Sequence, residues 1–145
     1  MSIGGVYLFE GSTLFLASCA GGHLGLANTL ADRGSDVNAV CSNSKRSALM
    51  YACRYGHRVV AVMLLDRGIN LEARDNGEWT ALHFAAYYDH PDTCLLLISR
   101  GIDLMAVDYG NLTALDLYGC TSFAIPPLMP ALHSAMQSRR SAVRF

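Results

Sequence analysis

The chain has 145 residues, of which 52% are hydrophobic and 16% are charged, with 11 Lys and Arg against 12 Asp and Glu. A chain of this length forms one ordinary domain with its own core, and its apolar content excludes a disordered chain. The even charge balance argues against a polyanion held by bulk charge, so we expect no nucleic-acid partner. We also expect no membrane insertion, because no run of 18 or more residues is apolar throughout.

The cysteines indicate a reducing environment. Their number is odd, no two form a Cys-x-x-Cys pair, and the chain is long enough to fold without disulfides. The N-terminal stretch lacks the basic region of a secretory signal, and Ser2 stands where myristoylation needs glycine. We therefore expect an intracellular protein, cytoplasmic or nuclear. The cysteines are Cys19, Cys41, Cys53, Cys94 and Cys120.

A repeat of 33 to 34 residues runs through the chain. "TALHFAAYYDH" (80–90) aligns with "SALMYACRYGH" (47–57), "TLFLASCAGGH" (13–23) follows the scheme more loosely, and "TALDLYGC" (113–120) starts it again. The closing histidine recurs at 23, 57 and 90, and a later glycine recurs at 34, 68 and 101. Several landmarks that keep one period predict a tandem array of similar units.

Each unit predicts a pair of short helices. A capping hydroxyl, at Thr13, Ser47, Thr80 and Thr113, opens the first helix, and Gly56 or Asp89 ends it in a left-handed conformation. The second helix begins near the histidine, with Pro91 in its first turn in the third unit, and the recurring glycine stops it. The turn signals "DNGE" (75–78) and "DYGN" (108–111) predict hairpins between units.

These motifs, with "TALHFAA", "YGH", "LLDRG" and "GSDVNA" foremost, resemble the ankyrin repeat. The resemblance covers residues 10 to 120. It implies an all-α solenoid of stacked antiparallel helix pairs with projecting β-hairpin loops. It also implies a concave protein-binding face, no catalytic residue and no cofactor. In such repeats the histidines tie loops and helix starts together, so His83 and His90 are expected to be architectural rather than a reactive pair.

The resemblance sets the expected organisation. One domain spans residues 1–138, with repeats at about 10–41, 42–74 and 75–107 and an atypical C-terminal cap at 108–138. A closing helix is expected from Pro130 to about Gln137, and a basic tail follows at 139–145. Two departures bear on the hairpins. The extra residue between the first two units is expected within "CSNSKR" (41–46), and Gly77 and Gly110 stand one place earlier than in the family pattern.

Residues at the variable, surface-facing positions of the repeat are the expected partner-binding residues. Trp, Tyr and Arg are typical of binding hot spots, because rigid aromatic area meets a polar group there. Tyr55 and Tyr88 occupy matching positions and could instead pack repeat against repeat. Trp79 and Tyr87 are expected to contact a partner, since a hairpin tip offers little core to enter. The expected residues are Arg46, Arg54, Tyr55, Trp79, Tyr87, Tyr88 and Tyr109.

The pattern therefore predicts a non-catalytic interaction module, monomeric, whose protein partner the sequence does not identify. A narrower form is a small free-standing regulator that covers an enzyme such as a kinase. The alternative class, an enzyme with a Cys/His site, is disfavoured because no basic neighbour in sequence activates Cys41 or Cys120, while Cys19, Cys53 and Cys94 are expected in the core. No metal site is expected, because His23, His57 and His90 stand one repeat apart.

Overall fold

The computed structural model describes residues 2–3, 6–7 and 11–120, and the side chains of residues 14–118. A pair of two-residue strands at the N-terminus, β1 (Ser2–Ile3) and β2 (Val6–Tyr7), runs antiparallel. The helices follow in pairs. They are α1 (Gly11–Ala20), α2 (Leu24–Asp32), α3 (Ala48–Arg54), α4 (Arg58–Asp66), α5 (Ala81–Tyr87), α6 (Pro91–Ser99) and α7 (Ala114–Cys120).

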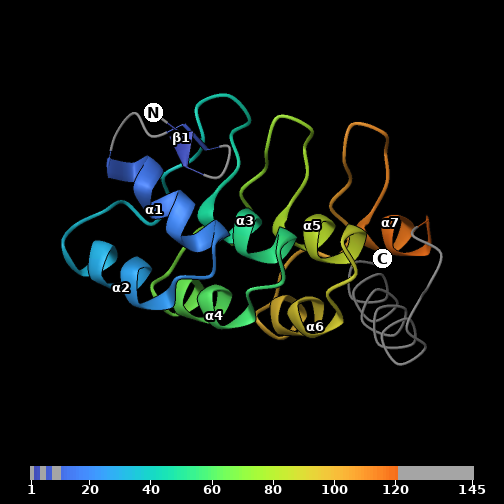
Figure 1. The fold of residues 1–145 in the computed structure, drawn as a ribbon. Coiled ribbons are helices and arrows are strands. Elements are labelled where there is room, and N and C mark those ends of the chain that lie inside the picture. Colours follow the sequence, from blue (N-terminus) through green and yellow to red (C-terminus); the bar gives the residue numbers. More distant parts are fainter. Residues whose placement is uncertain (1, 4–5, 8–10, 121–145) are drawn as a thin grey trace.

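The helices form two parallel rows. The first helices α1, α3, α5 and α7 make one row, the second helices α2, α4 and α6 make the other, and the long loops project together from one side of the stack (Figure 1). Buried side chains from both rows form one continuous core. The expected all-α solenoid is confirmed. The expected cap beyond residue 120, its closing helix and the basic tail lie outside the described residues.

The capping hydroxyls open three of the first helices as expected. Ser47 Oγ accepts a hydrogen bond from the Met50 amide (3.3 Å), and Thr113 Oγ1 accepts one from Asp116 (3.3 Å). Thr80 caps α5 in the same way, together with His83. The first unit differs, because α1 already begins at Gly11 and contains Thr13. The prediction that Thr13 starts its helix was therefore wrong, which fits the looser match of that unit to the repeat.

The turn between the two helices of a unit is closed by a histidine of the next unit. His57 Nε2 hydrogen-bonds the Ala20 carbonyl and His90 Nε2 the Arg54 carbonyl, each at 2.9 Å. These carbonyls end the preceding first helices, where backbone acceptors lack an intrahelical partner. The expectation that these histidines are architectural is confirmed.

A second set of contacts runs along the second helices. Arg67 binds Asp32 (2.7 Å) and Arg100 binds Asp66 (2.8 Å), so each arginine contacts the aspartate of the unit before it. All four side chains are substantially exposed, and each pair therefore contributes little to stability. The pairing repeats with the period of the chain and keeps neighbouring units in register.

Asparagine and glutamate side chains join the loops in the same direction. Asn38 Oδ1 accepts from the Asn70 amide (2.8 Å), and Glu72 Oε1 accepts from the Asp103 amide (2.9 Å). This series cannot continue, because the next equivalent residue is Met105, whose side chain is a poor acceptor. Asn38 therefore holds the loop of the next unit through its hydrogen bond with the Asn70 amide.

In the hairpin turns, the residue with a left-handed backbone conformation follows the glycine position rather than being the glycine itself. Lys45, Glu78 and Asn111 have φ of 61°, 63° and 61°, whereas Gly77 and Gly110 do not have positive φ. The extra residue of the first hairpin lies where it was expected. The Lys45 amide donates to the Cys41 carbonyl four residues back, but the Glu78 amide donates to Asp75, three residues back.

Gly56 and Gly68 provide a matched test of the histidine contact. Both have positive φ (73° and 79°), but a Cβ at Gly56 would lie 2.7 Å from the His90 ring, whereas one at Gly68 would meet open space. Gly68→Ala should lower the free energy of unfolding by about 1 kcal/mol, from backbone strain alone. Gly56→Ala should lower it by about 2 kcal/mol more, because the ring must shift. Urea unfolding measures both, and equal losses would show that the His90 ring does not require the glycine.

Candidate protein-binding site

Five of the seven predicted binding residues form one continuous row. The Trp79 and Tyr87 rings are 5.3 Å apart, and Tyr87 meets Tyr88 edge-on at 5.0 Å. The Arg54 guanidinium lies 5.1 Å from the Tyr88 ring and 5.2 Å from the Tyr55 ring. We call these residues the aromatic row. It runs from the base of the second hairpin to the ends of α5 and α3, and so spans two repeats on the face made by the first helices and the hairpins, the inner face.

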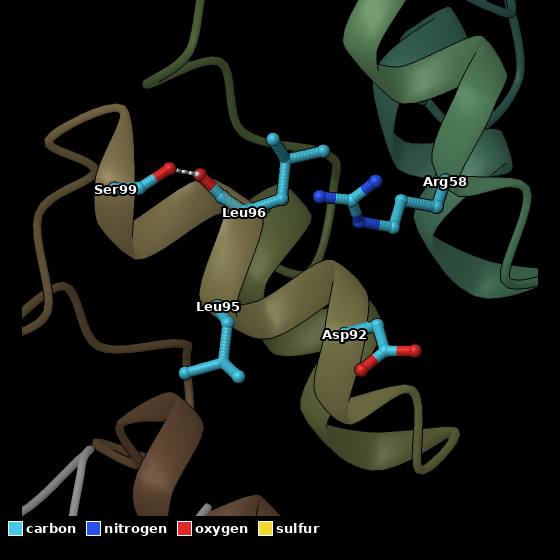
Figure 2. A pocket seen from close by; sticks show the side chains of 5 residues that line it. All are labelled: Arg58, Asp92, Leu95, Leu96 and Ser99. Atoms are coloured by element: carbon cyan, nitrogen blue, oxygen red, sulfur yellow. Dashed lines mark hydrogen bonds between the residues drawn. The ribbon is translucent and has the colours of Figure 1, made fainter.

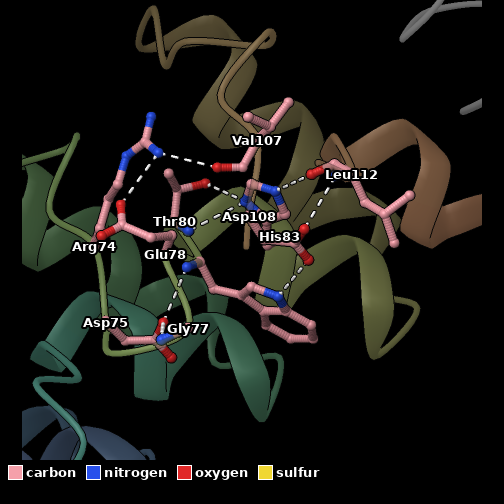
Figure 3. Close-up of polar contacts among 10 residues, drawn as sticks. Arg74, Asp75, Gly77, Glu78, Thr80, His83, Val107, Asp108 and Leu112 are labelled. Carbon is pink, nitrogen blue, oxygen red and sulfur yellow. Dashed lines mark hydrogen bonds and ion pairs between the residues drawn. The ribbon is translucent and has the colours of Figure 1, made fainter. Parts of the chain in front are cut away.

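Trp79 does not stand free at a hairpin tip. Its ring packs edge-on against Phe84 (4.9 Å) and stacks on His83 (6.0 Å), and its Nε1 donates to Asp108 Oδ2 (2.9 Å). Figure 3 shows His83 and Asp108 of this network. The expectation that Trp79 has little core to enter was wrong, because the hairpin of the next repeat lies beside it and supplies the carboxylate. Trp79 therefore supports the exposed tyrosine rings of the row.

His83 fixes the helix start beneath the row. Its Nδ1 accepts from the Thr80 amide (3.1 Å), and its Nε2 lies 3.0 Å from the Leu112 carbonyl in the next hairpin (Figure 3). Burial lowers the pKa of His83, outweighing the opposing hydrogen bond with Leu112 and the nearby carboxylate of Asp108. A neutral imidazole can accept at one nitrogen while it donates at the other. The residue thus joins two repeats.

The two other predicted residues lie apart from the row. The Arg46 guanidinium lies over the Phe84 ring (5.2 Å), which also contacts Trp79, and it pairs with Asp75 (3.6 Å). Tyr109 is 77% exposed in the third hairpin, and its backbone amide donates a hydrogen bond to the Gly77 carbonyl (3.3 Å). Arg46 therefore borders the row through Phe84, whereas Tyr109 is a separate exposed ring.

The two acidic residues of the second hairpin, Asp75 and Glu78, are both paired with arginines. Arg46 of the second repeat pairs with Asp75 of the third, and Glu78 pairs with Arg74 (3.4 Å). A partner would meet these charges already compensated. Arg54 differs, since no carboxylate within the described part of the chain lies within ion-pair distance of it.

The opposite side of the molecule carries a shallow hollow of about 400 Å³ between α4 and α6. Figure 2 shows that its side chains do not converge on one point, and that the Ser99 hydroxyl is used on the Leu96 carbonyl (2.6 Å). Such an arrangement gives a small ligand few convergent polar contacts. Arg58, Asp92, Leu95, Leu96 and Ser99 line it.

Cys41 has an environment that its sequence neighbours did not predict. Burial raises its pKa, but hydrogen bonds from Ser44, from the Asn43 amide and from the Tyr51 hydroxyl outweigh burial and lower the pKa to about 7. The sulfur occupies the position of Asp75, whose Oδ1 accepts from the Gly77 and Trp79 amides at 2.9 Å each. No basic neighbour contributes to this shift, and hydrogen bonds alone lower the pKa of Cys41. An alignment of the repeats that places the extra residue after Cys41 would reveal that Cys41 and Asp75 are equivalent.

The other cysteines lie where they were expected. Cys19, Cys53 and Cys94 are fully buried, and burial raises their pKa values, to about 12 for Cys19 and Cys94. The side chain of Cys120 is outside the described residues. Across the described side chains, no group of three or more His, Cys, Asp and Glu is placed to hold a metal ion. No helix in the described part of the chain has the length and apolar character needed to cross a bilayer.

Comparison with protein families agrees with this geometry. The family model "Ankyrin repeats (3 copies)" matches residues 13–108, and the chain belongs to this family. Ankyrin repeats are generally protein–protein interaction modules, and the family is typically non-catalytic. No curated protein matches the chain.

The position of Trp79 predicts a structural penalty for its removal. Trp79→Ala should lower the free energy of unfolding by about 2 kcal/mol, because a half-buried indole loses its ring contacts. Trp79→Phe should lower it by about 1 kcal/mol, mainly through the lost hydrogen bond to Asp108. Tyr87→Ala, at an exposed ring, should lower it by less than about 1 kcal/mol. Thermal and urea unfolding measure this order, and an unchanged melting curve for Trp79→Ala would contradict it.

The lowered pKa of Cys41 predicts selective alkylation. Since its pKa is about 7, the thiolate is half formed at neutral pH, and the iodoacetamide rate should rise with a midpoint near pH 7. Cys19 and Cys94 should stay unmodified in the folded protein, because their pKa values are raised to about 12. Tryptic peptide mapping over pH 5 to 9 measures each site. Tyr51→Phe should move the Cys41 midpoint upward, and an unshifted midpoint in that variant would count against the hydrogen-bond explanation.

Proposed function

We propose that this chain is a non-catalytic module that binds another protein through its inner face. The aromatic row forms the centre of the contact, and Arg46 and Tyr109 extend it towards the hairpins. Tyr55, Tyr87 and Tyr88 would contact the partner directly, while Trp79 holds Tyr87 in place from behind. The partner is itself a protein, and no nucleic acid takes part.

One observation carries the proposal: the aromatic row is exposed and yet held in place. Tyr55, Tyr87 and Tyr88 are 49%, 41% and 38% exposed although each contacts a neighbour within the row. A side chain that is already ordered loses little conformational entropy when it binds. Exposed Tyr and Arg side chains of this kind are typical of binding hot spots.

Two features of the described residues support the expected cell compartment and the narrower regulatory role. Cys19, Cys41, Cys53 and Cys94 are free thiols, as expected of a protein in a reducing intracellular compartment. The row lies on the face by which ankyrin repeats bind proteins, so a regulator that covers the surface of an enzyme, such as a kinase, would use the same residues. This narrower role is part of the proposal, and the identity of the captured partner decides it.

Affinity capture from the source cell, followed by quantitative mass spectrometry, tests the proposal. The variant Tyr55→Ala/Tyr87→Ala removes exposed rings from the inner face and should lose the specific partners at least tenfold. Val59→Ala/Leu95→Ala is the matched control, because it removes exposed apolar side chains (61% and 44% exposed) from α4 and α6 on the other row. Partners that are lost with the control variant but kept by the inner-face variant would overturn the proposal.

A further inference from the structure

Among the described arginines of the inner face, Arg54 is the one without an acidic partner in the described part of the chain. Arg46, Arg67, Arg74 and Arg100 each lie within 3.6 Å of a carboxylate oxygen. No carboxylate among the described residues lies at ion-pair distance from Arg54, although it is half-buried at the end of α3. A guanidinium is always charged, so Arg54 keeps a positive charge that no carboxylate of the described residues neutralises.

The Arg54 guanidinium lies close to two tyrosine rings. Its central carbon lies 5.2 Å from the Tyr55 ring centre and 5.1 Å from the Tyr88 ring centre, which are cation–π contacts. The contact attracts the charge to the ring, and the five N–H donors of the planar group lie in its plane. No hydrogen bond from the Arg54 side chain to another described residue is present. A fixed guanidinium with free N–H groups suits two parallel hydrogen bonds to one carboxylate.

The tyrosines around Arg54 add both polar and apolar contacts. The hydroxyls of Tyr55, Tyr87 and Tyr88 make no hydrogen bond to other described residues and can donate to a bound oxygen. Their partly exposed rings, with Trp79 behind Tyr87, present apolar area next to the charge. The cluster thus offers one cation, several hydroxyl groups and a flat apolar surface within two repeats.

We propose that this cluster binds a carboxylate of the partner: an Asp or Glu side chain in an extended segment, flanked by an apolar residue that packs on Tyr87 and Tyr88. The proposal rests on the proposed function and specifies the chemistry of its partner. Charge complementarity supports it, since Arg54 is the uncompensated charge among the rings. A phosphate dianion fits less well, because phosphate recognition relies on clusters of arginines. Here a single guanidinium is available, and the exposed Asp89 directly follows Tyr88.

A random 12-residue peptide library displayed on phage, selected against the full chain, tests the proposal. The selected peptides should be enriched in Asp or Glu next to an apolar residue. For a selected peptide made synthetically, fluorescence anisotropy should show Kd at least tenfold higher for Arg54→Gln, since a charged hydrogen-bond pair is lost. Arg54→Lys should bind with intermediate affinity, because it keeps the charge without the planar fork. Arg58→Gln, at an unpaired arginine at the start of α4, should leave Kd unchanged. Thermal unfolding of each variant separates lost binding from lost folding.

Changes in the peptide complete a double-mutant cycle with the Arg54 variants. Changing its acidic residue to the amide should weaken binding to the wild type at least tenfold and should add no further loss with Arg54→Gln. The proposal is overturned if selected peptides carry no acidic preference, if the amide peptide binds equally well, or if a phosphoserine in that place binds more tightly. In these cases Tyr55→Ala/Tyr87→Ala would still abolish binding, and the proposed function would stand. If no peptide is selected, or if selected peptides bind that double variant unchanged, the proposed function fails together with this inference.

Discussion

The structure depends on a hydrogen bond between each second-helix histidine and the unit before it. His57 and His90 satisfy the carbonyls of Ala20 and Arg54, which would otherwise lack a partner at the ends of short helices. The imidazole approaches the preceding turn so closely that Gly56 leaves no room for a side chain beside His90. The contact therefore sets both the spacing of the units and the sequence of the turn, and it places the ends of α3 and α5 side by side.

The aromatic row follows from this placement. Because the Arg54 carbonyl is held by His90, the Arg54 side chain emerges at a fixed point between Tyr55 and Tyr88. At the other end of the row, Trp79 is held by Asp108 from the next hairpin. Hydrogen bonds between repeats thus keep the side chains of this surface in place, which contacts within a single helix would rarely do. Groups fixed by a second set of contacts present a partner with a prepared geometry.

The sequence predicted those features that depend on short-range pattern. The caps at Ser47 and Thr80, the turn at Gly56 and the helix start at Pro91 are local and recur with the period of the chain. The looser first unit misled the same reasoning, since a hydroxyl inside a helix looks the same in sequence as one before it.

Features that depend on contacts between repeats could not be predicted in this way. Trp79 lies 29 residues from Asp108 along the chain, and the pairing of Arg46 with Asp75 neutralises charges that the sequence shows as separate. Cys41 takes an aspartate position only when one hairpin is given an extra residue. For Trp79 and Arg46, the neighbour that decides the chemistry belongs to another unit.

The arginine–aspartate pairs and the bonds of His57 and His90 run in one direction, and this has a consequence for how the array can change. Arg67 and Arg100 each contact the aspartate of the unit before, and His57 and His90 each bond to the preceding first helix. Each unit thus carries a donor side and an acceptor side of the same kind. Excision of the middle unit would leave Arg100 facing Asp32 and His90 facing Ala20, so the joints are interchangeable. Whole units can then be lost or duplicated without new joints, whereas loss of the middle unit would remove Arg54 and Tyr55 and leave Tyr88 without its guanidinium neighbour.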